Sequence, residues 1–182
     1  MVQDKFLRAF LHPRYWVTWF GLGLLWLLVQ LPYPAIRKLG TTAGRLSRRF
    51  LQRRESIARR NLELCFPDMS DEARERLIAE NFESLGMALL ETGIAWFWPD
   101  KRVRKFFDVE GFEHFAEAKA LNRGVMAIGV HFMSLELGGR VMGLCQPMMA
   151  TYRRHNTPLL EWVQTRRRKS SKKAVDGRRN LR

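Results

Sequence analysis

The sequence predicts an α/β fold in which an N-terminal membrane-anchor helix and several further helices precede a partial, mostly parallel sheet. The central observation is the uncharged run Val125–Val130, whose β-branched residues are typical of a buried strand. From Phe106 onward the pattern alternates strand, helix, strand, helix, strand, helix, which favours right-handed crossovers and parallel strands. The 182 residues suffice for one sizeable core, or for an anchor with a small domain.

The N-terminal part contains a long apolar segment, Tyr15–Leu31, with 17 residues, no charge and three tryptophans. This length is at the short end of what crosses a bilayer as a helix, and aromatic residues at one end are typical of an interfacial anchor. A cleaved signal peptide is disfavoured because Pro32 and Pro34 follow in place of a small-residue cleavage site. A buried core helix is a second alternative. We expect an uncleaved anchor that spans the bilayer or is embedded in one leaflet, with the rest of the chain cytoplasmic.

Two helices are predicted between this segment and the sheet. Thr41–Leu64 has apolar positions among many arginines, which indicates a basic helix that is either solvated or attracted to anionic lipid. Ser70 is a good N-cap, with acidic residues directly after it, and begins a helix that continues to about Trp96. The later expectations are strands at 106–109 and 147–152, and helices at 111–121, from Glu136 to about Gly143, and 157–164.

The charge is distributed unevenly along the chain, whose net charge is +14. Residues 1–60 carry 12 Lys and Arg against 2 acids, residues 61–165 carry 11 against 15, and residues 166–182 carry 9 against 1. Two basic ends favour an anionic partner such as a membrane surface, a phosphorylated substrate or nucleic acid. Nucleic acid is the weakest of these, because no helix-turn-helix, zinc-finger or RNA-binding pattern accompanies the basic residues.

The chemistry is expected where the predicted Val125–Val130 strand ends, because His131 follows it and Glu136 comes five residues later. An imidazole moves protons near neutral pH, and a carboxylate can hold its tautomer and stabilise the imidazolium. On one continuous helix the two residues would point to different faces, so they meet only if His131 lies in the turn and Glu136 in the first turn of the helix. The simpler alternative is an ordinary turn in which both side chains are solvated or bonded to backbone. A zinc site is less favoured, since no close Cys/His cluster is present.

Several stretches resemble one known family. They are Arg59–Pro67 (RRNLELCFP), Asn81–Ala88 (NFESLGMA), Val130–Gly139 (VHFMSLELGG) and Tyr152-Arg153. These residues are similar to the late acyltransferases of lipid A biosynthesis, and the similarity extends from about Leu11 to Gln164. Within that family, Trp96–Asp100 and His131–Cys145 most resemble the lauroyl and palmitoleoyl transferases, with the palmitoleoyl type closer.

The resemblance implies an inner-membrane enzyme with its active site on the cytoplasmic side and a fold of the glycerolipid-acyltransferase-like type. Such an enzyme transfers an acyl chain from acyl carrier protein to a hydroxyl of a Kdo-bearing lipid A precursor. It implies that His131 is the general base and Glu136 its support, with no nucleophilic Ser or Cys, no metal and no cofactor. The resemblance also implies that Arg153 and Arg168 bind substrate. Arg168 ends the family's Q-T-x-G-R block, in which Arg167 of this chain replaces the glycine.

The same reasoning divides the chain into three parts. Residues 1–38 are expected to form the membrane anchor, residues 39–165 an incomplete acyltransferase domain, and residues 166–182 a basic, disordered tail. A family member is expected to need about 300 residues, a usual size for one α/β unit. The sequence is therefore interpreted as truncated at its C-terminus, with a catalytically inactive membrane-anchored remnant as the alternative to an active enzyme.

Overall fold

The computed structural model describes residues 7–121, 125–146, 148–152, 155–169 and 173–176. Most of these residues are helical. The elements in chain order are η1 (Arg8–Leu11), η2 (Pro13–Tyr15), α1 (Trp16–Leu28), α2 (Tyr33–Ser47), α3 (Gln52–Cys65), α4 (Asp71–Phe97), α5 (Asp100–Phe106), α6 (Phe112–Ala120), α7 (Leu135–Cys145), β1 (Met149–Tyr152), α8 (Pro158–Lys169) and β2 (Lys173–Asp176).

The predicted α/β class, with its partial, mostly parallel sheet, is wrong for the described part of the chain. Residues 125–130 form no strand, and their large apolar side chains are exposed, Met126 and Ile128 each to 89%. The strands within the described ranges are β1 and β2, which pair in parallel with each other. A strand needs a paired neighbour to satisfy its backbone, and the apolar run at 125–130 has none there. The strand expected at 106–109 is also absent, because α5 extends to Phe106.

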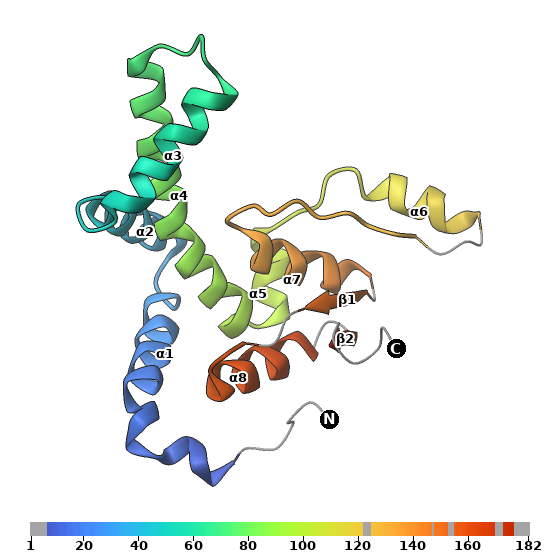
Figure 1. Cartoon of the computed structure of the whole chain (residues 1–182). Helices are drawn as coiled ribbons and strands as arrows, with labels where there is room; N and C mark the ends of the chain where they lie inside the picture. The colour runs from blue at the N-terminus through green and yellow to red at the C-terminus, as the bar shows by residue number, and fades with distance from the viewer. Residues whose placement is uncertain (1–6, 122–124, 147, 153–154, 170–172, 177–182) are drawn as a thin grey trace.

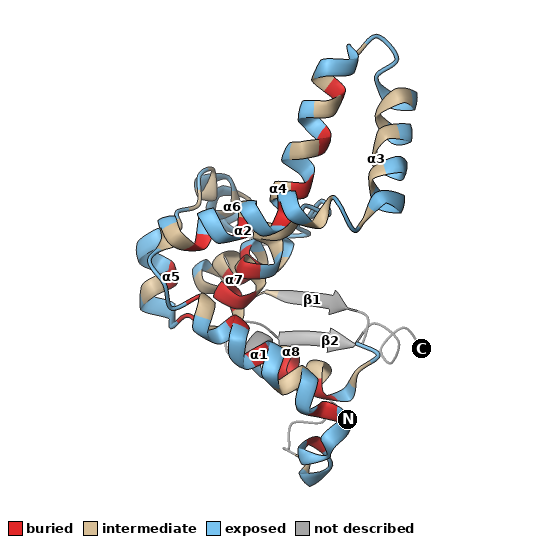
Figure 2. Cartoon of the chain, turned by 90° about the vertical axis from the view of Figure 1, so that its left-hand side faces the viewer, coloured by how far each residue is buried: buried red, intermediate tan, exposed pale blue. Residues whose placement is uncertain are grey.

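Helix α4 is the longest described element, and α1, α2, α3, α7 and α8 contact it, whereas α6 stands apart (Figure 1). The helix expected from Ser70 to about Trp96 is confirmed. The Ser70 hydroxyl accepts a hydrogen bond from the Ala73 N–H at 3.2 Å, and Asp71 and Glu72 lie in the first turn. Buried positions recur along α4, whereas α3 has none (Figure 2).

The single helix expected at 41–64 is two helices, α2 and α3, separated by a turn at residues 48–51. Arg48 lies in this turn and bonds to Glu55 of α3 and Glu75 of α4, both at 2.6 Å. Arg59 of α3 pairs with the same two carboxylates. These ion pairs hold α3 beside α4, a long-range arrangement that helical periodicity does not encode.

Helices α2 and α4 approach each other closely at three glycines. A Cβ on Gly44 would lie 2.9 Å from the Glu83 Cα, and one on Gly86 would lie 2.8 Å from the Gly44 Cα. Gly40 stands one helical turn before Gly44 and faces Met87 and Leu90. Small residues four apart give a helix a flat face, so the two backbones pack directly.

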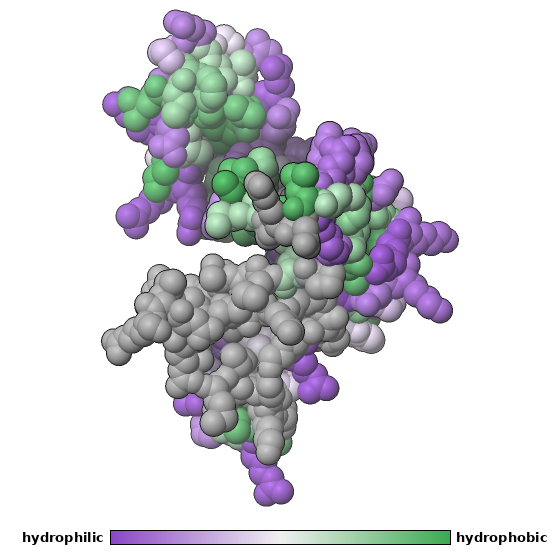
Figure 3. Space-filling model, turned by 90° about the vertical axis from the view of Figure 1, so that its right-hand side faces the viewer, coloured by the Kyte–Doolittle hydropathy of each residue, from purple (hydrophilic) through white to green (hydrophobic). Residues whose placement is uncertain are grey.

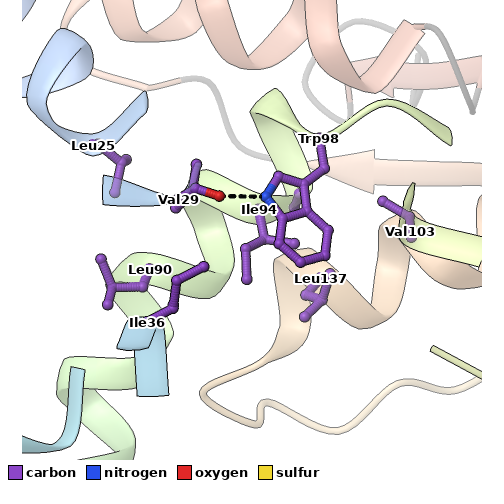
Figure 4. Packing of buried hydrophobic residues seen from close by; sticks show 9 residues of the cluster. Leu25, Val29, Ile36, Leu90, Ile94, Trp98, Val103 and Leu137 are labelled. Carbon is purple, nitrogen blue, oxygen red and sulfur yellow. Dashed lines mark hydrogen bonds between the residues drawn. The ribbon is translucent and has the colours of Figure 1, made fainter. Parts of the chain in front are cut away.

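Two clusters of buried side chains form the core. The larger joins α1, α2, α4, α5 and α7, and Figure 4 shows it around the Trp98 indole, which donates to the Val29 carbonyl oxygen at 2.6 Å. Its buried members are Leu25, Val29, Ile36, Leu90, Ile94, Ala95, Trp98, Val103 and Leu137. The second cluster packs the N-terminal segment against α8 and contains Phe10, Tyr15, Leu22, Leu159 and Val163.

The expected membrane-anchor helix is also wrong as a spanning element. Helix α1 has 13 residues, and at about 1.5 Å per residue it extends ~20 Å against a hydrocarbon core of ~30 Å. None of the helices in the described ranges combines the length and apolar character that crossing a membrane requires. One side of α1 is buried in the two clusters through Leu22 and Leu25, while Trp16, Phe20 and Leu27 are exposed.

Candidate functional site

Glu136 lies in the first turn of α7 and is half-buried. Its Oε1 accepts a hydrogen bond from the indole Nε1–H of Trp96 at 3.1 Å, although the two residues are 40 positions apart. A carboxylate near a helix N-terminus is stabilised by the orientation of the peptide dipoles. Glu136 is therefore an ionisable group with a defined position rather than a freely rotating surface side chain.

Helix α7 is fixed to the body of the molecule on several sides. Leu137 is buried in the larger core cluster. The buried Arg140 guanidinium pairs with Asp100 at the start of α5. At the far end of α7, Arg104 of α5 donates to the Leu144 carbonyl oxygen at 2.6 Å. The position of Glu136 is thus set by the packing of α4, α5 and α7.

His131 precedes α7 in a segment without regular secondary structure and is exposed. The Phe132 N–H donates to the Val130 carbonyl oxygen at 2.9 Å, so His131 is the central residue of a three-residue turn. No hydrogen bond joins His131 to Glu136 among the described residues. An exposed imidazole is accessible to a substrate hydroxyl, and catalytic hydrogen bonds in a free enzyme are often long.

A hollow of about 620 Å³ lies beside this segment, between α2 and α4. The three residues directly after His131, Phe132 to Ser134, form part of its wall. Glu91 of α4 is a further wall residue, and burial raises the pKa of its carboxyl above the ordinary value. A half-buried titratable group with a raised pKa, in a hollow next to the His131 segment, is the kind of group found at functional sites. The other wall residues are Tyr33, Arg37, Thr41, Glu80, Asn81, Glu83, Ser84 and Met87.

A second hollow of about 640 Å³ lies between α3 and α4 and shares Met133 and Ser84 with the first. Its wall is mostly apolar and includes Ile57, Leu62 and Leu77. Figure 3 shows a gathering of hydrophobic side chains at this end of the molecule, bordered by hydrophilic ones. Both hollows therefore lie along α4. The one beside the His131 segment is lined mostly by polar residues, and the other by mostly apolar ones.

The side chains of the two arginines expected to bind substrate lie outside the described part of the structure. Arg153 lies outside the described residues, and Arg168 lies near the end of α8 with its side chain likewise undescribed. Within the described ranges, no group of three His, Cys, Asp or Glu side chains is arranged to hold a metal ion.

The family described as bacterial lipid A biosynthesis acyltransferase matches residues 3–182. The chain belongs to this family. It is 72% identical over 180 residues to the lipid A biosynthesis palmitoleoyltransferase of Escherichia coli K12. This alignment covers 99% of this chain and 59% of the relative. The chain is 50% identical over 177 residues to the lipid A biosynthesis lauroyltransferase of the same organism, covering 97% of this chain and 58% of the relative.

A lipid A biosynthesis acyltransferase of Haemophilus influenzae is 44% identical over 180 residues, covering 98% of this chain and 57% of the relative. The chain thus spans less than two thirds of the length of these curated lipid A acyltransferases. No solved structure matches it.

Trp96 was not predicted from the sequence to be part of the site. In the sequence, Trp96 marked only the end of the helix that begins at Ser70, and Trp98, two residues later, packs in the core. Trp96, by contrast, donates to Glu136. A buried or half-buried indole usually finds an acceptor, which is the available signal, but the identity of that acceptor depends on how α4 and α7 pack.

Proposed function

We propose that this chain carries the general base of an acyltransferase in lipid A biosynthesis. The reaction moves a fatty acyl chain from acyl carrier protein to a hydroxyl of a Kdo-bearing lipid A precursor. The observation that carries the proposal is the family match over residues 3–182, which includes His131, Glu136 and helix α7, which carries Glu136. The 72% identity to a palmitoleoyltransferase supports a palmitoleoyl donor.

In the proposed reaction, His131 accepts the proton of the acceptor hydroxyl as its oxygen attacks the thioester carbonyl. A new C–O bond forms, the C–S bond breaks, and the proton leaves with the carrier thiol. Glu136 orients the imidazole and stabilises the imidazolium that forms transiently. The hydroxyl is itself the nucleophile, so the proposal needs no covalent enzyme intermediate, no metal and no cofactor.

The surroundings of His131 support this chemistry. The mostly apolar hollow between α3 and α4 suits a hydrocarbon chain, and the first hollow, beside Phe132–Ser134, has polar walls that suit a hydrophilic group. We assign Arg153 and Arg168 to the anionic groups of the substrates. The strongly basic chain also suits an acidic carrier protein and sugar phosphates.

We also propose that the chain works at the cytoplasmic face of a bacterial inner membrane. Several large apolar residues of α1 are exposed, among them Trp16, Phe20 and Trp26. Arg8 and Arg14 precede these residues, and Arg37 and Lys38 follow them. Aromatic residues bordered by basic ones favour a helix that lies in the headgroup region of an anionic membrane.

The proposal is tested by transfer of labelled palmitoleoyl groups from acyl carrier protein to Kdo2-lipid IVA, using membranes that contain the full chain. We expect turnover, and a fall of about 10²–10⁴-fold in the His131→Ala variant, because a general base contributes that much to a rate. His114→Ala is the matched control, since His114 is exposed on α6, outside the walls of both hollows. Its activity should equal that of the unmodified chain.

A second candidate is a membrane-bound chain without catalysis, which is favoured by the exposure of the apolar residues 125–130. Absence of turnover with both palmitoleoyl and lauroyl donors would support this candidate. Equal turnover in the unmodified chain and the His131→Ala variant would reject His131 as the base.

A further inference from the structure

We propose that Trp96 is a positioning residue that holds the Glu136 carboxylate for its work beside His131. The proposal rests on the function proposed above, because it concerns Glu136 as the support of a catalytic histidine. Its direct observation is the hydrogen bond from the indole Nε1–H to Glu136 Oε1 at 3.1 Å. An indole N–H donates at every pH at which the protein is folded and never accepts, so it always favours the ionised carboxylate.

The indole is held in place from several sides. Trp96 packs against both clusters of the core, and its ring meets the neighbouring Phe97 ring edge-on, with centroids 6.4 Å apart. Two residues later, Trp98 is buried and bonded to the Val29 carbonyl oxygen. Rotation of the Trp96 indole would disturb this packing, so the donor has a fixed direction.

The acceptor is held equally well. Glu136 is one residue before the buried Leu137 and one helical turn before Arg140, which pairs with Asp100. Donor and acceptor therefore lie on separate helices that the core joins rigidly. A functional group keeps its productive geometry when its neighbours are fixed by packing in this way.

The indoles of three other tryptophans donate to a different kind of acceptor. Trp16, Trp19 and Trp98 each donate to a backbone carbonyl oxygen, of Leu11, Phe10 and Val29 respectively. Such bonds tie one segment to another and serve the fold. Trp96 donates instead to an ionisable side chain in the proposed site, which a structural tie does not require.

The decisive experiment combines kinetics with nuclear magnetic resonance on the full chain. In the acyl-transfer assay, we expect Trp96→Phe to lower kcat about tenfold with KM little changed, because one hydrogen bond to a charged group is lost. Its pH–rate profile should change on the acid side relative to that of the unmodified chain, because the carboxylate beside the proposed base is held less firmly without the donor. Trp19→Phe is the matched control: it removes an indole bond to the Phe10 carbonyl oxygen and should leave both quantities unchanged.

The resonance arm needs no turnover. In the ¹⁵N-labelled chain, the Trp96 indole signal is identified by its loss in Trp96→Phe. We expect that signal to shift with pH in one acid step, and the step to vanish in Glu136→Gln, while the Trp19 signal shows neither effect. A Trp96 signal that titrates identically in Glu136→Gln, or not at all, would overturn the proposal.

The outcomes separate this inference from the proposed function. A His131→Ala variant without turnover, beside a Trp96→Phe variant with unchanged kcat and pH profile, would sustain the function and overturn the positioning role. Absence of turnover in every variant would overturn the function, and the indole titration would then decide by itself whether Trp96 holds Glu136.

Discussion

The α2–α4 crossing and the segment 125–134 represent opposite ways in which a chain can use apolar and small residues. At the crossing, Gly40, Gly44 and Gly86 bring two helix backbones into contact. In the segment 125–134, apolar side chains such as Ile128 and Phe132 stand exposed around His131. The comparison teaches that small residues fix the contact of two helices at the α2–α4 crossing, whereas His131 lies on irregular backbone among exposed apolar side chains.

The strongest way to test this contrast is to make the same change in both regions. Ile94 is 0% exposed and Ile128 is 89% exposed. We expect Ile94→Ala to lower the free energy of unfolding by about 4 kcal/mol, because the larger core cluster loses a buried side chain and gains a cavity. Ile128→Ala should change it by no more than about 0.5 kcal/mol. Urea denaturation followed by far-UV circular dichroism measures both, and equal effects would show that residues 125–130 are buried in solution.

Crowding of the α2–α4 crossing at Gly44 should give the next largest loss of stability. In Gly44→Ala the added methyl group would press on the backbone of Phe82 and Glu83, so the two helices must separate. We expect a loss of about 3 kcal/mol in the free energy of unfolding. The control is Gly23→Ala in α1, where a Cβ meets nothing within 4 Å and alanine favours the helix. A Gly44→Ala variant as stable as the Gly23→Ala variant would show that α2 and α4 do not touch there.

Removal of the ion pairs that hold α3 against α4 should give the smallest loss of stability among these variants. It adds a charged contact to the comparison of the apolar and glycine contacts. Hydrogen bonds from Arg59 and Arg48 lower the pKa of the Glu75 carboxyl below its usual value. A lowered folded-state pKa means that the stabilisation is present above the ordinary value and is lost as the pH falls through the lowered one. Because Glu75 is partly exposed, Glu75→Gln should cost about 0.5 kcal/mol at neutral pH after screening.

The difference between Glu75→Gln and the unmodified chain should shrink as the pH falls through the ordinary pKa of a glutamate towards the lowered pKa of Glu75 in the folded state. Glu110→Gln serves as the reference, since Glu110 is exposed in the turn before α6. Urea midpoints measured across this pH range decide the matter. A stability gap that stays constant with pH would mean that the charge of Glu75 contributes nothing.

Local signals in the sequence determined several features of this protein correctly. The Ser70 cap with its acidic neighbours predicted α4, and the helix expected from Glu136 to about Gly143 is α7. The motifs also indicated the family, which residues 3–182 match. Caps, acidic first turns and family motifs are encoded within short stretches of chain, so a single sequence is sufficient to reveal them.

Only the tertiary structure decided the remaining features. Periodicity cannot state whether the apolar run Val125–Val130 finds a neighbouring strand, and the described chain offers it none. The break between α2 and α3 depends on carboxylates as distant as Glu75, and the partner of the Trp96 indole lies 40 residues away. Such contacts depend on which elements pack together, because burial and hydrogen-bond satisfaction are settled by the whole fold rather than by neighbours in sequence.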